Sequence, residues 1–174
     1  MKTKLNQSKI KLAVLSAIVA GSMGLSATSN AATTTATMTV STTVANSCTI
    51  SVGAMDFGAY DMSSGTALTA TADITSTCTL GGATTITLSQ GGTSSDDSSE
   101  SSPLRQMTNG LVSLDYNLYT DVARTDVWGN TIGSGAAVTA TGSAVTTTIY
   151  GDITPEQSVS AGSFSDSVTV TLTY

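Results

Sequence analysis

The chain has 174 residues, a net charge of −6 at pH 7, no histidine, and only 10% charged residues. Four of its six basic residues are lysines within the first eleven positions. The rest of the chain therefore carries two arginines against twelve acidic residues, a net charge of −10. Such an acidic, lysine-free surface repels phosphate backbones and anionic membranes, which excludes nucleic acid as a partner.

The N-terminal segment predicts a signal peptide over residues 1–31, cleaved after Ala31. Its lysines precede an apolar run, residues 12–25, that two glycines interrupt and that is too short for a transmembrane anchor. Ser29-Asn30-Ala31 then fits the small-x-small pattern of a cleavage site. We expect the mature chain to be exported through the periplasm, to have no integral membrane segment, and to form one domain of about 140 residues.

Residues 32–47 show an uninterrupted alternation that is typical of a β-strand with one apolar face. Every odd position from Thr35 to Thr43 is Thr or Ser. The even positions are Ala36, Met38, Val40, Thr42 and Val44. Two interpretations remain open here. The segment is either the first strand of the domain's own sheet, or an extension whose apolar face serves another molecule.

The two cysteines, Cys48 and Cys78, predict a disulfide, because an even number of cysteines in an exported chain usually pairs. The alternatives are two free thiols or half of a metal site. A metal site is disfavoured by the absence of histidine and of any CxxC pair. Closing a loop of this length stabilises the folded state by roughly 3–4 kcal/mol in the chain-entropy model.

The rest of the chain reads as short strands separated by Gly-rich and polar turns. The predicted strands are residues 48–52, 69–80, 84–88, 111–119, 138–151 and 163–174. In residues 111–119 the expected core face is Val112, Leu114, Tyr116 and Leu118. In the last segment Phe164, Asp166, Val168, Val170, Leu172 and Tyr174 share one face. About six strands and no helical periodicity predict an all-β sandwich.

No arrangement of residues indicates catalysis. Without histidine no Ser-His-Asp or Cys-His arrangement can form, and the mature chain has no lysine for a Ser-Lys pair. Asp96, Asp97 and Glu100 cluster in the polar stretch 90–102, but they lack the regular ligand spacing of a calcium loop. Trp128 is expected in the core or at its rim. We therefore predict no enzyme, no cofactor and no metal site.

Several motifs in this order resemble the spore coat protein U domain family, which includes the archaic chaperone–usher pilins. The resemblance covers essentially the whole mature chain. It rests on the alternating strand before Cys48, Phe57-Gly58, Ile74-Thr-Ser-Thr-Cys78, Tyr116-Asn-Leu-Tyr119, Asp121-Val-Ala-Arg-Thr125, Ile149-Tyr-Gly151, and Ala161-Gly-Ser-Phe-Ser-Asp166 through Tyr174.

This resemblance implies an incomplete immunoglobulin-like β-sandwich that lacks its final strand and carries an N-terminal donor strand. It implies that a periplasmic chaperone lends the missing strand, and that the extension of the next identical or related subunit later replaces it at an outer-membrane usher. Consistent with this, the sequence stops at Tyr174 with no further strand to complete the sheet.

The expected organisation is a signal peptide at 1–31, a donor-strand extension at 32–40 and a pilin domain at 41–174. The expected function is that of a structural subunit of a cell-surface fimbrium that supports adhesion and biofilm formation. The alternative is a self-contained secreted binding module, for instance for glycans, in which the 32–44 segment would belong to the protein's own sheet.

Overall fold

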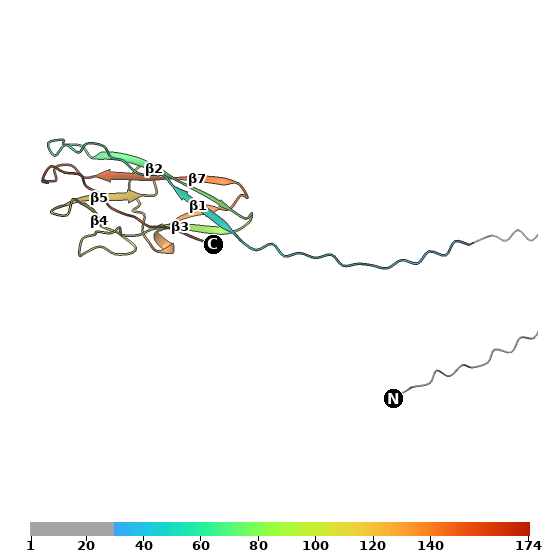
Figure 1. Cartoon of the computed structure of the whole chain (residues 1–174). Coiled ribbons are helices and arrows are strands. Elements are labelled where there is room, and N and C mark those ends of the chain that lie inside the picture. Colours follow the sequence, from blue (N-terminus) through green and yellow to red (C-terminus); the bar gives the residue numbers. More distant parts are fainter. Residues whose placement is uncertain (1–29) are drawn as a thin grey trace, which may run out of the picture. The chain divides into compact units, whose positions relative to one another are not determined.

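The computed structural model describes residues 30–174, which divide into two units after Ser41 (Figure 1). The predicted signal peptide therefore lies almost wholly outside the described residues. Residues 30–47 form neither helix nor strand, and all of their side chains are exposed. Within residues 30–174 no helix is long and apolar enough to cross a membrane.

Residues 48–174 contain eight strands and one short 3-10 helix. These are β1 Cys48–Val52, β2 Leu68–Cys78, β3 Ala83–Leu88, β4 Arg105–Thr108, β5 Ser113–Tyr119, the 3-10 helix Ile132–Ser134, β6 Ala136–Thr139, β7 Ala144–Ile153 and β8 Val170–Thr173. A five-stranded sheet has the order β1-β2-β7-β5-β4, and a three-stranded sheet has the order β6-β3-β8. All neighbouring strands are antiparallel, which confirms the predicted all-β sandwich.

The strand count is higher than the six expected, for two reasons. The predicted strand 138–151 is two strands, because a turn around Gly142 sends β6 and β7 into different sheets. Strand β4 was not predicted at all. Its sequence, Arg-Gln-Met-Thr, has neither apolar alternation nor β-branched enrichment. It is a strand because it pairs with β5.

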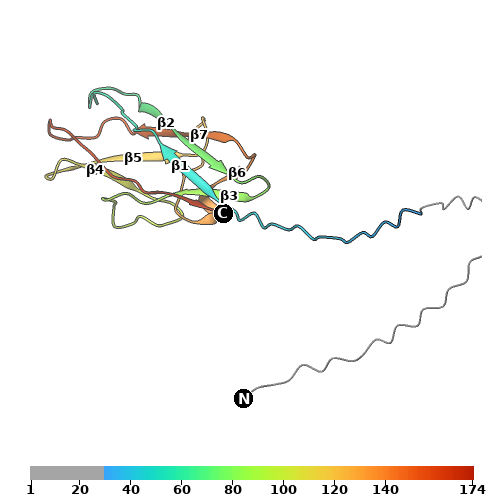
Figure 2. The same ribbon diagram turned by 45° about the vertical axis from the view of Figure 1, so that its right-hand side comes forward.

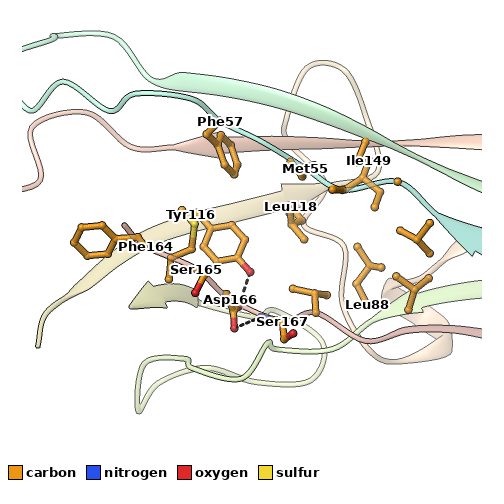
Figure 3. Close-up of a pocket in the computed structure, with 17 residues that line it drawn as sticks. Met55, Phe57, Leu88, Tyr116, Leu118, Ile149, Phe164, Ser165, Asp166 and Ser167 are labelled. Atoms are coloured by element: carbon orange, nitrogen blue, oxygen red, sulfur yellow. Dashed lines mark hydrogen bonds between the residues drawn. The ribbon is translucent and has the colours of Figure 1, made fainter. Parts of the chain in front are cut away.

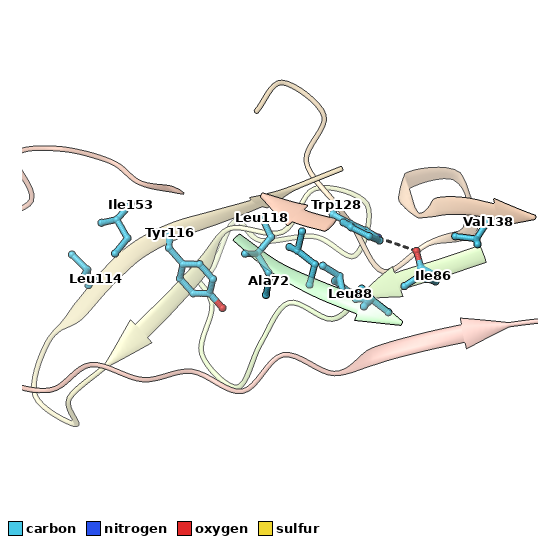
Figure 4. Packing of buried hydrophobic residues seen from close by; sticks show 11 residues of the cluster. Ala72, Ile86, Leu88, Leu114, Tyr116, Leu118, Trp128, Val138 and Ile153 are labelled. Carbon is cyan, nitrogen blue, oxygen red and sulfur yellow. Dashed lines mark hydrogen bonds between the residues drawn. The ribbon is translucent and has the colours of Figure 1, made fainter. Parts of the chain in front are cut away.

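The core lies between the sheets and uses the alternation that the sequence predicts (Figure 4). On β5, Leu114, Tyr116 and Leu118 are buried, whereas Val112 is 37% exposed because β5 begins only at Ser113. Trp128 is fully buried and donates its indole N–H to the Ile86 carbonyl of β3 at 2.8 Å. This hydrogen bond satisfies the one polar atom of the largest core side chain.

Arg105 is a charged residue that is unexpectedly buried in the interior. It is 1% exposed and donates from Nε to the Ser89 carbonyl and from Nη2 to the carbonyls of Leu88 and Trp128. Burial lowers the pKa of its guanidinium to about 10, because a low-dielectric environment disfavours the charged form. Arg105 therefore holds the edge strand β4 to the chain that follows β3.

The predicted disulfide joins Cys48 to Cys78. These residues face each other at the first pair of the β1–β2 ladder. The bond thus fixes the start of β1, which is an edge strand, to a strand in the interior of the sheet.

Replacing both Cys48 and Cys78 by Ser should lower the free energy of unfolding by roughly 3–4 kcal/mol, because the reduced chain regains loop entropy when it unfolds. The measurement is urea unfolding of the variant beside the parent protein. The parent in reductant is the control and should unfold at the same urea concentration as the variant. Equal stability of the oxidised parent and the variant would contradict the prediction.

Candidate functional site: an apolar groove between two sheet edges

The sandwich has a groove on the side where β1 and β8, the edge strands of the two sheets, approach each other. Two adjoining hollows of about 420 and 610 Å³ make up this groove. One wall is the chain that continues from β1, residues 52–62, and the other is residues 159–170, which lead into β8. We call this feature the groove below.

The groove is lined mainly by apolar side chains (Figure 3). Its floor includes Ala72, Leu88, Leu118 and Ile149, which are members of the buried core. Its walls include Met55, Phe57, Phe164, Val168 and Val170, all of which are only partly buried. An apolar hollow that reaches the core and is rimmed by half-buried side chains is typical of a binding groove.

The C-terminal wall bends at residues 161–162 and then alternates regularly, but only part of it is a strand. Every even residue from Phe164 to Leu172 is half-buried and every odd residue is exposed, as the sequence predicts. Ser165 pairs with Thr108 beside the larger sheet, whereas Val170–Thr173 pairs with β3 in the smaller sheet. The predicted strand 163–174 is therefore divided, because the segment crosses from one sheet to the other. Tyr174 is 60% exposed.

The outer edge of this wall carries unpaired backbone groups. The Ser89 N–H donates to the Thr169 carbonyl at 2.9 Å, and Ser165 exchanges two hydrogen bonds with Thr108. Backbone groups alternate in direction along an extended chain, so the even residues point theirs away from β3 and β4. Within residues 30–174 the backbone groups of Asp166 and Val168 accordingly have no hydrogen-bond partner. The groove thus offers the backbone edge that an added strand requires.

Asp166 is the one charged side chain among the even residues of this wall. Its Oδ2 accepts the Tyr116 hydroxyl at 2.6 Å, and its Oδ1 accepts the Ser167 N–H at 2.7 Å (Figure 3). Its Oδ1 also accepts the Gly92 N–H at 2.7 Å. Burial, reinforced by the Asp166 carboxylate, raises the pKa of the Tyr116 hydroxyl, so this group remains a donor. Gly91 has a φ of +90°, and a Cβ there would overlap the Asp166 carboxylate.

The opposite wall, residues 52–62, packs directly against the backbone of Gly151. A Cβ added at Gly151 of β7 would lie 2.5 Å from Met55 Sδ and 2.8 Å from Phe57 Cζ. Phe57 also meets the Tyr116 ring edge to face, with centroids 6.3 Å apart. Gly151 therefore lets the chain after β1 lie close to the sheet.

The predicted donor-strand residues lie outside this groove's lining. Ala36, Met38, Val40, Thr42 and Val44 all belong to the exposed stretch 30–47. Met38, Val40 and Val44 are 81%, 80% and 76% exposed. The sequence also singled out Phe57 and the alternating C-terminal residues, but it gave no sign that they form two walls of one groove. In residues 30–174 there is no group of three acidic or cysteine side chains placed to hold a metal ion.

Comparison with known proteins identifies the relatives of this chain. The family model described as the Spore Coat Protein U domain matches residues 34–171. Protein U of Myxococcus xanthus is 35% identical over 176 aligned positions, which cover 95% of this chain and 98% of that protein. The match to this family indicates a structural protein and not an enzyme.

A solved structure shows the same fold. It is the crystal structure of the CsuC–CsuE chaperone–tip adhesion subunit pre-assembly complex from the archaic chaperone–usher Csu pili of Acinetobacter baumannii. The match has a TM-score of 0.55 and 18% identity, and it covers 76% of this chain. The chain spans 40% of the length of that protein chain.

Substituting Gly151 by Ala should destabilise the domain by about 1–3 kcal/mol, because Met55 and Phe57 must move away from β7. Gly133→Ala is a suitable control, since a Cβ there meets nothing within 4 Å. Chemical unfolding of both variants measures the difference. If Gly151→Ala proves as stable as Gly133→Ala, the close packing of this wall is not a constraint on the fold.

Proposed function

The chain belongs to the Spore Coat Protein U domain family, and from this premise we propose that it is a structural subunit of a bacterial surface pilus. The subunits assemble by donor-strand complementation, in which the N-terminal extension of one subunit fills the groove of the next. A periplasmic chaperone occupies the groove beforehand, and an outer-membrane usher exchanges the two. The finished fibre lies at the cell surface and serves adhesion and biofilm formation.

The observation that carries this proposal is the groove with its unpaired backbone edge. Adding an extended segment to a sheet edge gains main-chain hydrogen bonds, and alternate side chains then fill the pockets beneath. The even residues of the wall supply the free edge, and the hollows beside them are apolar. Residues 36–44 supply a segment of matching chemistry, which is exposed, lies outside the described strands and has one apolar face.

The energy available is large enough for a durable fibre. Met38, Val40 and Val44 are almost fully exposed, and each contributes roughly 1.5–3 kcal/mol when buried. Main-chain hydrogen bonds along the wall add to this stabilisation. Since the donor segment and the groove are different surfaces, each contact leaves one of each free, and the assembly grows without closing.

The same groove accounts for the need for a chaperone. An unpaired edge above an apolar hollow invites pairing with any extended chain, so it requires protection before assembly. The structurally similar Csu protein was crystallised in a chaperone–subunit complex, which supports this part of the proposal.

The alternative remains a self-contained secreted binding module that uses the groove for a glycan or another ligand. The two functions differ in what residues 32–44 do. In the pilus they join subunits, whereas in the binding module they complete the protein's own sheet.

Deleting residues 32–40 from the exported chain should abolish polymers while leaving the sandwich folded, because the extension is not part of its strands. Periplasmic extracts of parent and deletion are run on SDS gels with and without boiling. The parent is expected to give a ladder that survives unheated SDS and collapses on boiling, and the deletion to give monomer only. Monomers from both, with only the deletion unfolded, would favour the binding module.

A point substitution tests the two faces of the extension separately. Val40→Asp places a charge on the apolar face and should eliminate the ladder, because a buried unpaired carboxylate is costly. Thr39→Asp is the matched control on the opposite face and should retain it. Both positions are exposed, so neither substitution should alter thermal unfolding of the monomer. Equal ladders from the two variants would show that the alternation does not govern assembly.

A further inference from the structure

We propose that the donor strand runs antiparallel to β8 in one particular register, which is fixed by Thr42 lying opposite Asp166. This inference rests on the proposed function and adds the residue pair that determines how two subunits match. The occupant of the groove is residues 36–44 of a second copy of this chain.

The inward face of the C-terminal wall and the inward face of the donor segment show the same pattern of side chains when the two are read in opposite chain directions. The inward face of the wall is Phe164, Asp166, Val168, Val170 and Leu172, with one charged side chain among four apolar ones. The inward face of the donor is Ala36, Met38, Val40, Thr42 and Val44, with one hydroxyl among four apolar ones. In an antiparallel pair, Thr42 opposite Asp166 sets Val44 against Phe164 and, at the other end, Ala36 against Leu172.

The direction follows from the ends of the groove. Cys48 and Tyr174 line one small hollow, so the chain enters β1 at the end of the groove where β8 finishes (Figure 2). The other end is lined by Met62 and Val159. An antiparallel donor leaves its Val44 beside Phe164, at this second end. The domain of the donating subunit then lies beyond this second end, away from the acceptor's own extension. A parallel donor would instead place that domain at the end from which the acceptor's own extension leaves.

The chemistry at Asp166 favours a hydroxyl. A carboxylate has about four lone-pair sites, and Tyr116, Gly92 and Ser167 use three of them. A side chain directly opposite has its Cβ about 4.5–5.5 Å away, within reach of the remaining site. A shift of two residues in either direction would bury an apolar side chain against the carboxylate and place the Thr42 hydroxyl against Phe164 or Val168.

Side-chain size agrees with the same register. The 420 Å³ hollow is lined as far as Val170 and does not reach Leu172. Met38, the largest donor side chain, lies opposite Val170, where there is volume to fill. Ala36, the smallest, lies opposite Leu172, which is beyond the lining of this hollow.

Disulfide trapping on the outer face tests the register without altering the groove. In this register Thr39 lies opposite Thr169, and both are exposed. Opposed residues have Cα atoms within the range that a disulfide bridges, whereas residues two positions away are separated by about 7–8 Å. The full chain carries Thr39→Cys with Thr169→Cys, and the register controls pair Thr39→Cys with Ser167→Cys or with Thr171→Cys.

The expected result is a ladder that resists boiling in SDS without reductant for the 39/169 pair, and its loss for the two controls. Cross-linking through position 167 or 171, with none through 169, would overturn the register while leaving strand exchange intact. If the parent chain forms no ladder even in unheated SDS, the proposed function itself fails. These results therefore separate the two proposals.

Moving the hydroxyl tests whether Thr42 and Asp166 fix the register. Val40→Thr combined with Thr42→Val keeps the composition but moves the polar side chain by two positions. In the Thr39→Cys background, the cross-link from position 39 should shift from position 169 to position 167, since the hydroxyl at position 40 then faces Asp166. A cross-link that stays at 169 would show that other contacts fix the register, and would overturn the role of this pair.

Discussion

The arrangement of the groove depends on how the C-terminal segment, residues 164–173, is held. Its backbone hydrogen-bonding groups point alternately toward the protein and away from it. Among its odd residues, Ser165 and Thr169 direct backbone groups inward to Thr108 and Ser89, and Thr171 and Thr173 pair with β3. Its even residues direct theirs outward, where the described part of the chain has no partner for Asp166 or Val168. Backbone groups beside an apolar hollow gain stability from hydrogen-bond partners, so this edge is able to accept an added strand. The groove and the unpaired backbone edge thus belong to the same segment of the chain.

Three local features keep the two walls of the groove in place. The Asp166 carboxylate joins the segment to Tyr116 of the larger sheet and to the loop at Gly92. Gly151 admits the Met55 wall close to β7, and the disulfide fixes the start of β1. A binding surface that is already ordered loses little entropy when it is filled. In the assembly that we propose, the main entropic cost would therefore fall on residues 36–44, which form no strand in the monomer.

The strands that could be predicted were those whose sequence shows apolar alternation with β-branched residues, such as β2 and β5. Strand β4 could not be predicted, because its pairing with β5 and the burial of Arg105 depend on chain far away in sequence. The sequence identified Asp166 as a member of an alternating face and of one family motif, but not by its contacts. Its contacts reach Gly92 and Tyr116, and no local pattern indicates either of them.

The sequence by itself determined the all-β class, the disulfide, the non-enzymatic character and the alternating faces of 36–44 and 164–172, because each follows from residue types or local periodicity. Only the tertiary structure decided that residues 52–62 and 159–170 form the walls of one groove, and that the even backbone groups of the second wall point outward. The physical reason is that an alternating pattern fixes which side chains share a face. Which sheet edge that face adjoins depends on pairings between distant strands.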